Sequence, residues 1–137
     1  MIGVLVYIEH IDMLPFNVQI KPGSPAYEQV VYAVQKALIT GKLKPEDRFP
    51  SVRQLSQELR INPNTAHKIV AHLTAEGLLQ VEPGIGTVVQ KIPAGSAQDK
   101  SVLLNKDLER LVVGAKRLSL GLSEVTRALE KHWEKIS

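Results

Sequence analysis

The chain contains no cysteine and only a small excess of positive charge. Of its 137 residues, 17 are lysine or arginine and 14 are aspartate or glutamate, so the formal net charge is +3. Without cysteine, the chain cannot form disulfides, use a thiolate nucleophile or build most zinc sites, which fits a reducing cytoplasm. The weak charge does not by itself identify a partner. The sequence also lacks a nucleophile paired with a base, a phosphate-cradling loop and a cluster of metal ligands, so we expect no enzyme, no metal and no cofactor.

The first residues form an apolar run, Ile2–Ile8, that suggests either a strand or the core of a signal. This run has no basic leader and no cleavage pattern, and it is too short to span a membrane. We therefore expect a soluble, cytoplasmic protein without a membrane partner. Two alternatives stay open: translation starts at Met13 rather than Met1, or residues 1–14 form an ordered strand packed on a neighbouring subunit. The alternation of apolar and polar residues in Phe16–Ile20 predicts a short lead strand.

A first helix is predicted to begin with Ser24 as its cap and Pro25 at its first position, and to end at Gly41. Apolar residues recur along it at helical spacing and should form its buried side: Tyr27, Val30, Val31, Val34 and Leu38. We expect this helix to lie beneath the helices that follow. Leu43 and Phe49 should complete the same core.

Two short helices should follow, separated by a tight turn. Ser51 and Gln54 have the spacing of a capping box, which starts a helix at Ser51. That helix must end before Asn62, because Asn62 is a strong N-cap and Pro63 suits the first position of another helix. Gly77 can adopt the left-handed conformation that closes this last helix. The buried faces should comprise Val52, Leu55 and Leu59, and then Ala66, Ile69, Val70 and Leu73.

The polar side of the last helix and the hairpin after it indicate the fold. Asn64, His67, Lys68 and His72 should face away from the core. Residues 79–82 and 87–90 resemble strands, and the turn at Pro83 and Gly84 should join them into a wing. A short helix, a turn and a second helix with a polar N-terminus is the geometry that brings side chains to base edges in a major groove. The predicted fold is therefore mainly α with a small β-hairpin wing, a winged helix-turn-helix followed by a C-terminal helical dimerisation hairpin.

The segment from Tyr27 to Val89 resembles the DNA-binding domain of the GntR family of bacterial transcription regulators. The motifs that match, in order, are Tyr27–Gln29, Thr40–Leu43, Phe49–Leu55, Asn62–Thr65, Glu76–Leu79 and Gly84–Thr87. The resemblance implies DNA contacts from Arg53, Asn62, Asn64, Thr65, His67 and Gly84. The chain departs from the family pattern at Arg60 and Glu46, where the family often has glycine. It departs again in the wing, because residues 80–83 carry no positive charge.

We expect the complete DNA-binding surface to comprise Ser51, Arg53, Gln54, Asn62, Asn64, Thr65, His67, Lys68, Gly84 and Gly86. The fork of donors on Arg53 suits a phosphate or a guanine, whereas Lys68 is either a phosphate contact or a surface lysine. His67 is expected to contact a base or a phosphate, and His72 to be solvated. These two histidines are five residues apart rather than the four that place a pair of metal ligands on one helical face.

The remaining chain reads as a linker and a helical tail. Residues 93–98 are small, polar and interrupted by proline and glycine, which is typical of a hinge. In residues 99–137 a helical apolar period is interrupted at Gly121, and Ser123 should cap another helix. Two such helices cannot bury wide apolar faces alone in about 40 residues, so they should pair with a second subunit. The predicted dimerisation residues are Leu104, Leu108, Leu111, Val112, Leu118, Val125, Leu129 and Trp133.

This organisation assigns residues 1–20 to an N-terminal extension, 21–92 to the DNA-binding domain, 93–98 to the linker and 99–137 to the tail. A short two-helix tail resembles the YtrA-type subfamily, which implies a homodimeric repressor, with transporter operons among the regulated genes. We expect a sequence-specific regulator that binds an inverted repeat in double-stranded DNA. The alternative is a winged-helix protein-interaction module without DNA binding. An unknown small-molecule effector is a further candidate partner, since Trp133 suits an inter-helix cavity as well as a dimer core.

Overall fold

The computed structural model describes residues 14–136. The expectations for Ile2–Ile8 and for a start at Met13 therefore lie outside the described residues. The chain divides between Ile92 and Pro93 into two compact units. Among the described residues, no helix has both the length and the apolar character needed to cross a membrane.

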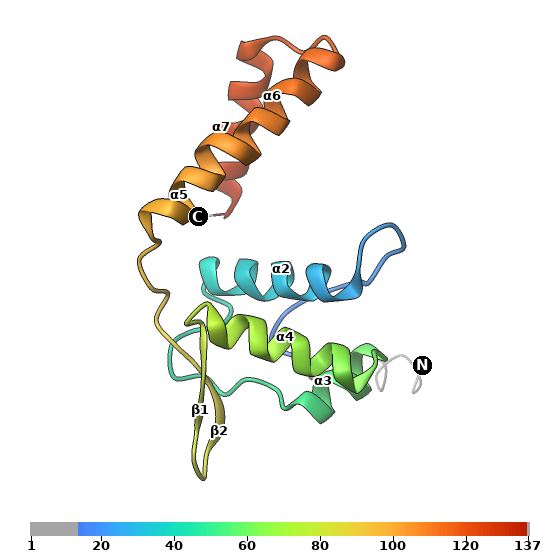
Figure 1. Ribbon diagram of the computed structural model, residues 1–137, viewed down its shortest axis with the longest axis vertical. Helices are drawn as coiled ribbons and strands as arrows, with labels where there is room; N and C mark the ends of the chain where they lie inside the picture. Colours follow the sequence, from blue (N-terminus) through green and yellow to red (C-terminus); the bar gives the residue numbers. More distant parts are fainter. Residues whose placement is uncertain (1–13, 137) are drawn as a thin grey trace, which may run out of the picture. The chain divides into compact units, whose positions relative to one another are not determined.

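The first unit contains three helices and a two-stranded antiparallel hairpin. The helices are α2 (Ala26–Ile39), α3 (Val52–Leu59) and α4 (Pro63–Ala75), and the hairpin consists of β1 (Leu79–Glu82) and β2 (Gly86–Val89). Helix α4 is central, since it packs against α2, α3 and β1, and Figure 1 shows α2 and α3 on either side of it. This arrangement confirms the predicted winged helix-turn-helix.

The core of this unit surrounds α4. Its fully buried side chains include Leu55 from α3, Ile69 and Leu73 from α4, and Val30 and Val34 from α2. These are the apolar positions that the helical spacing predicts. Leu43 and Phe49 complete the core as expected, while Tyr27, Val52, Leu59 and Val70 are partly buried against it.

The predicted lead strand at Phe16–Ile20 is wrong. Residues 17–20 have no strand structure, and the sheet within residues 14–136 consists of β1 and β2 alone. Phe16 instead stacks on Phe49, with ring centroids 5.9 Å apart and planes 8° from parallel. Val18 is also packed against the core. The alternation therefore reflects a segment lying across the core, which needs no partner strand.

Most predicted helix boundaries agree with the structure. Ser51 Oγ accepts a hydrogen bond of 3.1 Å from the Gln54 amide at the start of α3. Asn62 Oδ1 accepts one of 2.8 Å from the Asn64 amide, directly before Pro63 at the first position of α4. Gly77 has a φ of 77°, the left-handed conformation expected after α4.

The start of α2 differs from the prediction by one residue. Pro25, not Ser24, is the N-cap, and no side chain caps this end of the helix. The residues before α2 are held instead from inside it. Gln29 Nε2 donates to the carbonyls of Lys21 at 2.7 Å and Ser24 at 2.9 Å, and its Oε1 accepts from the Lys21 amide at 2.9 Å. Gln29 thus fixes the segment before α2, while the expected serine cap is absent.

Arg60 and Glu46 adopt left-handed backbone conformations, with φ values of 54° and 79°. Arg60 closes α3, and its amide donates to the Ser56 carbonyl. Glu46 joins the loop before α3 to the wing through a 2.9 Å bond from its amide to the Val89 carbonyl. A side chain in this conformation costs about 1–2 kcal/mol relative to the right-handed one, so glycine would make both turns more easily. The chain nevertheless keeps the left-handed turn at both residues.

The wing is joined to the segment that precedes α3. Strands β1 and β2 pair from Leu79 with Val89 to Glu82 with Gly86. On the outer side of β2, Arg48 forms an antiparallel bridge with Val88. This segment is therefore fastened to the hairpin along β2.

The second unit consists of a long irregular helix and, after a short turn, a second helix that runs back in the opposite direction (Figure 1). The long helix comprises α5 (Ala97–Ser101), a π-helical segment η1 (Val102–Asp107) and α6 (Leu108–Arg117), and the returning helix is α7 (Leu122–Ile136). The helical period predicted from Leu103 to Leu118 falls within this continuous helix up to Arg117, and at η1 the backbone is more widely wound.

Both helix starts in this unit differ from the predictions. Ser96 Oγ accepts a 3.0 Å bond from the Asp99 amide, so α5 begins at Ala97, inside the predicted linker. Ser96, which is predicted as part of the linker, is therefore the N-cap of α5. The predicted cap Ser123 lies inside α7, and Glu124 Oε1 instead accepts a 3.2 Å bond from the Gly121 amide.

Large apolar side chains of the second unit remain exposed, and Ala115 is the buried residue among those described there. The exposed ones are Val102, Leu103, Leu104, Leu108, Leu111, Val112, Val113, Leu118, Leu120, Leu122, Leu129 and Trp133. Val125 is half-buried. This unit therefore lacks a closed core of its own.

Candidate nucleic-acid interface

The N-terminus of α4 presents a polar surface next to α3. Asn62, Asn64, His67 and Lys68 are exposed and Thr65 is half-buried, whereas the other side of α4 fills the core. Neither α3 nor α4 has an acidic residue in its first turn. The partial positive charge of each helix N-terminus is therefore not neutralised locally, which favours an anionic partner.

A first open hollow lies between α3 and the start of α4. It is lined by Arg53, Ser56 and Gln57 from α3 and by Pro63 and His67 from α4. The structure thus brings together two of the predicted DNA-contacting residues, Arg53 and His67, from different helices. A guanidinium and an imidazole on one rim can both donate hydrogen bonds to a base edge or a phosphate.

A second open hollow lies between the wing and the start of α3. Ser51 and Gln54 line it from α3, and Gly86 lines it from β2, so three further predicted residues meet here. Arg48 and Thr87 also line this hollow. Arg48 is not among the residues predicted from the sequence, although a cation placed directly before the Phe49–Ser51 motif is a signal that could identify it.

The remaining predicted residues line neither hollow. Gly84 is at the wing tip with a φ of 78°, and its Cα has open space around it. Asn62 uses its side-chain oxygen to cap α4. The ammonium of Lys68 lies 4.5 Å from the centroid of the Tyr27 ring, in cation–π contact with α2. Lys68 is therefore held on the α2 side of α4, away from Arg53 and His67.

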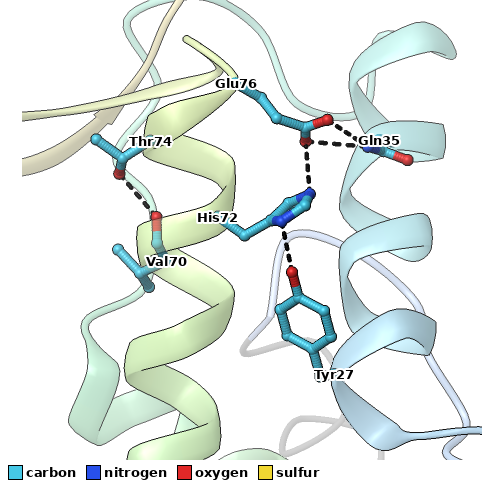
Figure 2. A network of polar contacts seen from close by, with 6 residues as sticks. All are labelled: Tyr27, Gln35, Val70, His72, Thr74 and Glu76. Atoms are coloured by element: carbon cyan, nitrogen blue, oxygen red, sulfur yellow. Dashed lines mark hydrogen bonds and ion pairs between the residues drawn. The ribbon is translucent and has the colours of Figure 1, made fainter.

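The prediction that His72 is solvated is wrong. Its ring is half-exposed and sits edge-on to the Tyr27 ring, with centroids 5.4 Å apart. Figure 2 shows that both ring nitrogens have partners: Nδ1 shares a hydrogen bond with the Tyr27 hydroxyl, and Nε2 lies 3.3 Å from Glu76 Oε1. Gln35 Nε2 donates to the same carboxylate oxygen at 3.1 Å. His72 therefore belongs to a polar network that joins α2 to α4.

Comparison with known proteins identifies the family. The model for bacterial regulatory proteins of the gntR family matches residues 26–89. The HTH-type transcriptional repressor YtrA of Bacillus subtilis strain 168 is 32% identical over 101 residues, which cover 72% of this chain and 78% of YtrA. The chain belongs to the GntR family. The relatives that match are transcription regulators, which confirms the expectation of a DNA-binding regulator rather than an enzyme.

Two solved structures show that the GntR likeness extends to the fold of most of the chain. A transcriptional antiterminator from Listeria monocytogenes EGD-e matches 88% of this chain and 91% of its own, with a TM-score of 0.76 at 21% identity. A GntR family transcriptional regulator from Listeria monocytogenes matches 82% of this chain and 98% of its own, with a TM-score of 0.61 at 21% identity. The C-terminal helices are therefore part of a fold that other proteins share.

Proposed function

We propose that this GntR-family protein is a homodimeric repressor that binds an inverted-repeat operator in double-stranded DNA. The observation that carries the proposal is the meeting of Arg53 and His67 on one hollow beside the exposed polar start of α4. The name of YtrA, a transcriptional repressor, supports repression. The short two-helix tail, which resembles the YtrA type, favours a transporter operon as the target.

The recognition step follows from the chemistry of these side chains. The start of α4 enters the major groove, where Asn64, Thr65 and His67 face base edges. Arg53 approaches from α3 and binds a guanine or a phosphate through its paired donors. Gly84 and Gly86 keep the wing tip slim, so that its backbone can approach the DNA closely.

Dimerisation is assigned to the second unit. Leu104, Leu111 and Leu118 are 63%, 48% and 62% exposed in a single chain, and a second copy of the unit offers matching apolar faces. The full set of proposed dimerisation residues is Leu104, Leu108, Leu111, Val112, Leu118, Val125, Leu129 and Trp133. A two-fold dimer places its recognition helices about 34 Å apart, one turn of DNA, and reads an inverted repeat.

Control by a small-molecule effector would act through the segment that connects the units. Residues 91–96 have neither helical nor strand structure, so this connection can change its course at low cost. An effector bound among the tail helices would then alter the spacing of the two DNA-binding heads.

A protein-interaction module without DNA binding is the second candidate, and the absence of positive charge from the wing favours it. The two functions differ in their dependence on salt. Binding to DNA through phosphate contacts weakens steeply as salt rises, whereas docking through the apolar residues Val81 and Ile85, which are 62% and 50% exposed in the wing, would not.

The proposal is tested by footprinting and salt titration of the purified protein on the DNA upstream of its own gene. We expect protection of an inverted repeat and binding that Arg53→Ala weakens by roughly 1 to 3 kcal/mol. Lys36→Ala is the control, because Lys36 is an exposed cation on α2. Unchanged binding by Arg53→Ala would remove Arg53 from the site. Binding that is weak and indifferent to sequence at all salt concentrations would favour the interaction module.

A further inference from the structure

We propose that Arg48 binds a backbone phosphate beside the half-site and supplies the cationic contact that the wing itself lacks. The inference rests on the proposed DNA-binding function and adds a residue and a surface to it. The surface is the hollow between the wing and the start of α3, and its ligand is the phosphate backbone of the flanking duplex.

The wing has no cation with which to bind DNA. Residues 79–90 contain no lysine or arginine, and Glu82 adds a negative charge at the end of β1. A hairpin that approaches the polyanionic backbone in this state gains no Coulombic attraction from its own side chains. A cation held next to the wing would supply this attraction to the DNA backbone.

Arg48 is held beside the wing by main-chain hydrogen bonds on both sides of it. The Phe49 amide donates to the Thr87 carbonyl at 2.8 Å, and the Val89 amide donates to the Asp47 carbonyl at 2.8 Å. Arg48 itself bridges Val88 in antiparallel register. These contacts fasten residues 47–49 to the outer edge of β2 through an isolated β-bridge, so Arg48 should move with the wing.

The side chain of Arg48 is directed by its neighbour across the bridge. Directly opposed residues in an antiparallel pair project to the same face, and Val88 is buried at 2% exposure whereas Arg48 is exposed. The aliphatic stem of Arg48 can cover Val88 while the guanidinium stays in solvent. The charge is thus presented at the mouth of the hollow.

The surroundings of Arg48 leave its charge available. No ion pair of Arg48 is found among residues 14–136, and the neighbouring Asp47 carboxylate accepts a 2.9 Å bond from the Lys44 amide. Ser51, Gln54 and Thr87 line the same hollow, and each carries a side-chain donor. A phosphate oxygen seated there can accept bonds from the guanidinium and from these neutral donors.

The test compares salt dependence on the footprinted operator and on an unrelated duplex. Arg48→Met removes the charge but keeps most of the stem, Arg48→Gln is a second neutral variant, and Arg48→Lys keeps a charge. Lys36→Met is the matched control, since it removes one exposed cation from α2. Circular dichroism of every variant verifies that the head is folded.

We expect each neutral variant to weaken binding to the operator and to the unrelated duplex by the same factor. The slope of log K against log salt should become shallower by about 0.9 for each phosphate that the protein no longer neutralises, or roughly 2 for a dimer. Arg48→Lys should restore most of the slope, and Lys36→Met should match the wild type. The ratio of operator to unrelated binding should not change, because a phosphate contact carries no sequence information.

Each contrary result has its own meaning. Wild-type slopes in both neutral variants would show that Arg48 makes no phosphate contact. A fall in the operator ratio alone would make Arg48 a base contact and overturn the proposal as well. If the wild type bound neither duplex in a salt-dependent way, both the proposed DNA-binding function and the role of Arg48 would be wrong. If Arg53→Ala lost binding while the Arg48 variants did not, the DNA-binding function would stand and the role of Arg48 would be wrong.

Discussion

The two units of the chain use similar helical apolar patterns with opposite results. In the first unit, Leu55, Ile69 and Leu73 are completely buried, whereas in the second Leu104 and Leu118 are more than 60% exposed. The difference lies in the number of layers. Helix α4 is covered by α2, α3 and β1, while the second unit has two helical stretches and no further layer among its own described residues.

The comparison separates two sources of stability. The first unit, the head, has a closed core and should fold whether or not the second unit, the tail, has a partner. In the proposed dimer the tail buries its exposed apolar side chains by association, so its stability should depend on protein concentration. Predictions that target one unit at a time test this division.

The largest expected effect is the loss of a core side chain in the head. Leu73→Ala should lower the free energy of unfolding by about 2–5 kcal/mol, because it removes completely buried methyl groups and leaves a cavity. Urea unfolding followed by far-ultraviolet circular dichroism measures it. Leu104→Ala makes the same chemical change at a side chain that is 63% exposed, and it should leave the transition of the head within about 0.5 kcal/mol of wild type. Equal losses in both variants would contradict the division.

A charge placed in the tail should break the dimer without unfolding the head. Leu111→Asp puts a carboxylate on the apolar face of α6 and should raise the dimer dissociation constant by at least about 30-fold, as expected for a central interface residue worth about 2 kcal/mol. Sedimentation equilibrium measures the constant. Lys116→Asp introduces the same residue at an exposed position of α6 outside the proposed dimerisation residues, so it should remain dimeric. Dissociation of both variants, or of neither, would remove Leu111 from the interface.

The smallest expected effect concerns the polar network that joins α2 to α4. Tyr27→Phe should lower the unfolding free energy by about 1 kcal/mol, because it removes the hydroxyl that bonds His72. Tyr32→Phe, on the same helix and 61% exposed, is the matched control and should be neutral. A double-mutant cycle with His72→Gln measures the coupling energy between the two side chains. If the two losses of unfolding free energy simply add, the hydrogen bond does not stabilise the packing of α2 on α4.

Local signals in the sequence predicted most of the head correctly. The caps at Ser51 and Asn62 and the left-handed Gly77 involve atoms within a few residues of each other, so residue type and spacing suffice to find them. The errors at Ser24 and Ser123 have the same local character. In each case a serine suited the cap but does not cap the helix. Gln29 instead donates to the carbonyl of Ser24 before α2, and Glu124 accepts from the Gly121 amide before α7.

The site was harder to predict where its contacts are distant in sequence. Tyr27 and His72 are 45 positions apart, and no spacing rule connects them. Arg48 becomes part of the candidate interface only because its segment pairs with β2. The predicted strand at Phe16–Ile20 is wrong for a related reason. The alternation of apolar and polar residues is local, but a strand requires a neighbouring strand, and no local pattern reveals whether one is present.

The sequence by itself determined the order of the helices, the turn between α3 and α4 and the identity of the polar residues at the start of α4, because capping and helical periodicity act over a few residues. Only the tertiary structure decided which of those polar residues meet. It brought Arg53 beside His67, held Lys68 on Tyr27 and carried Arg48 to the edge of the wing, because such contacts depend on how separate elements pack around one shared core.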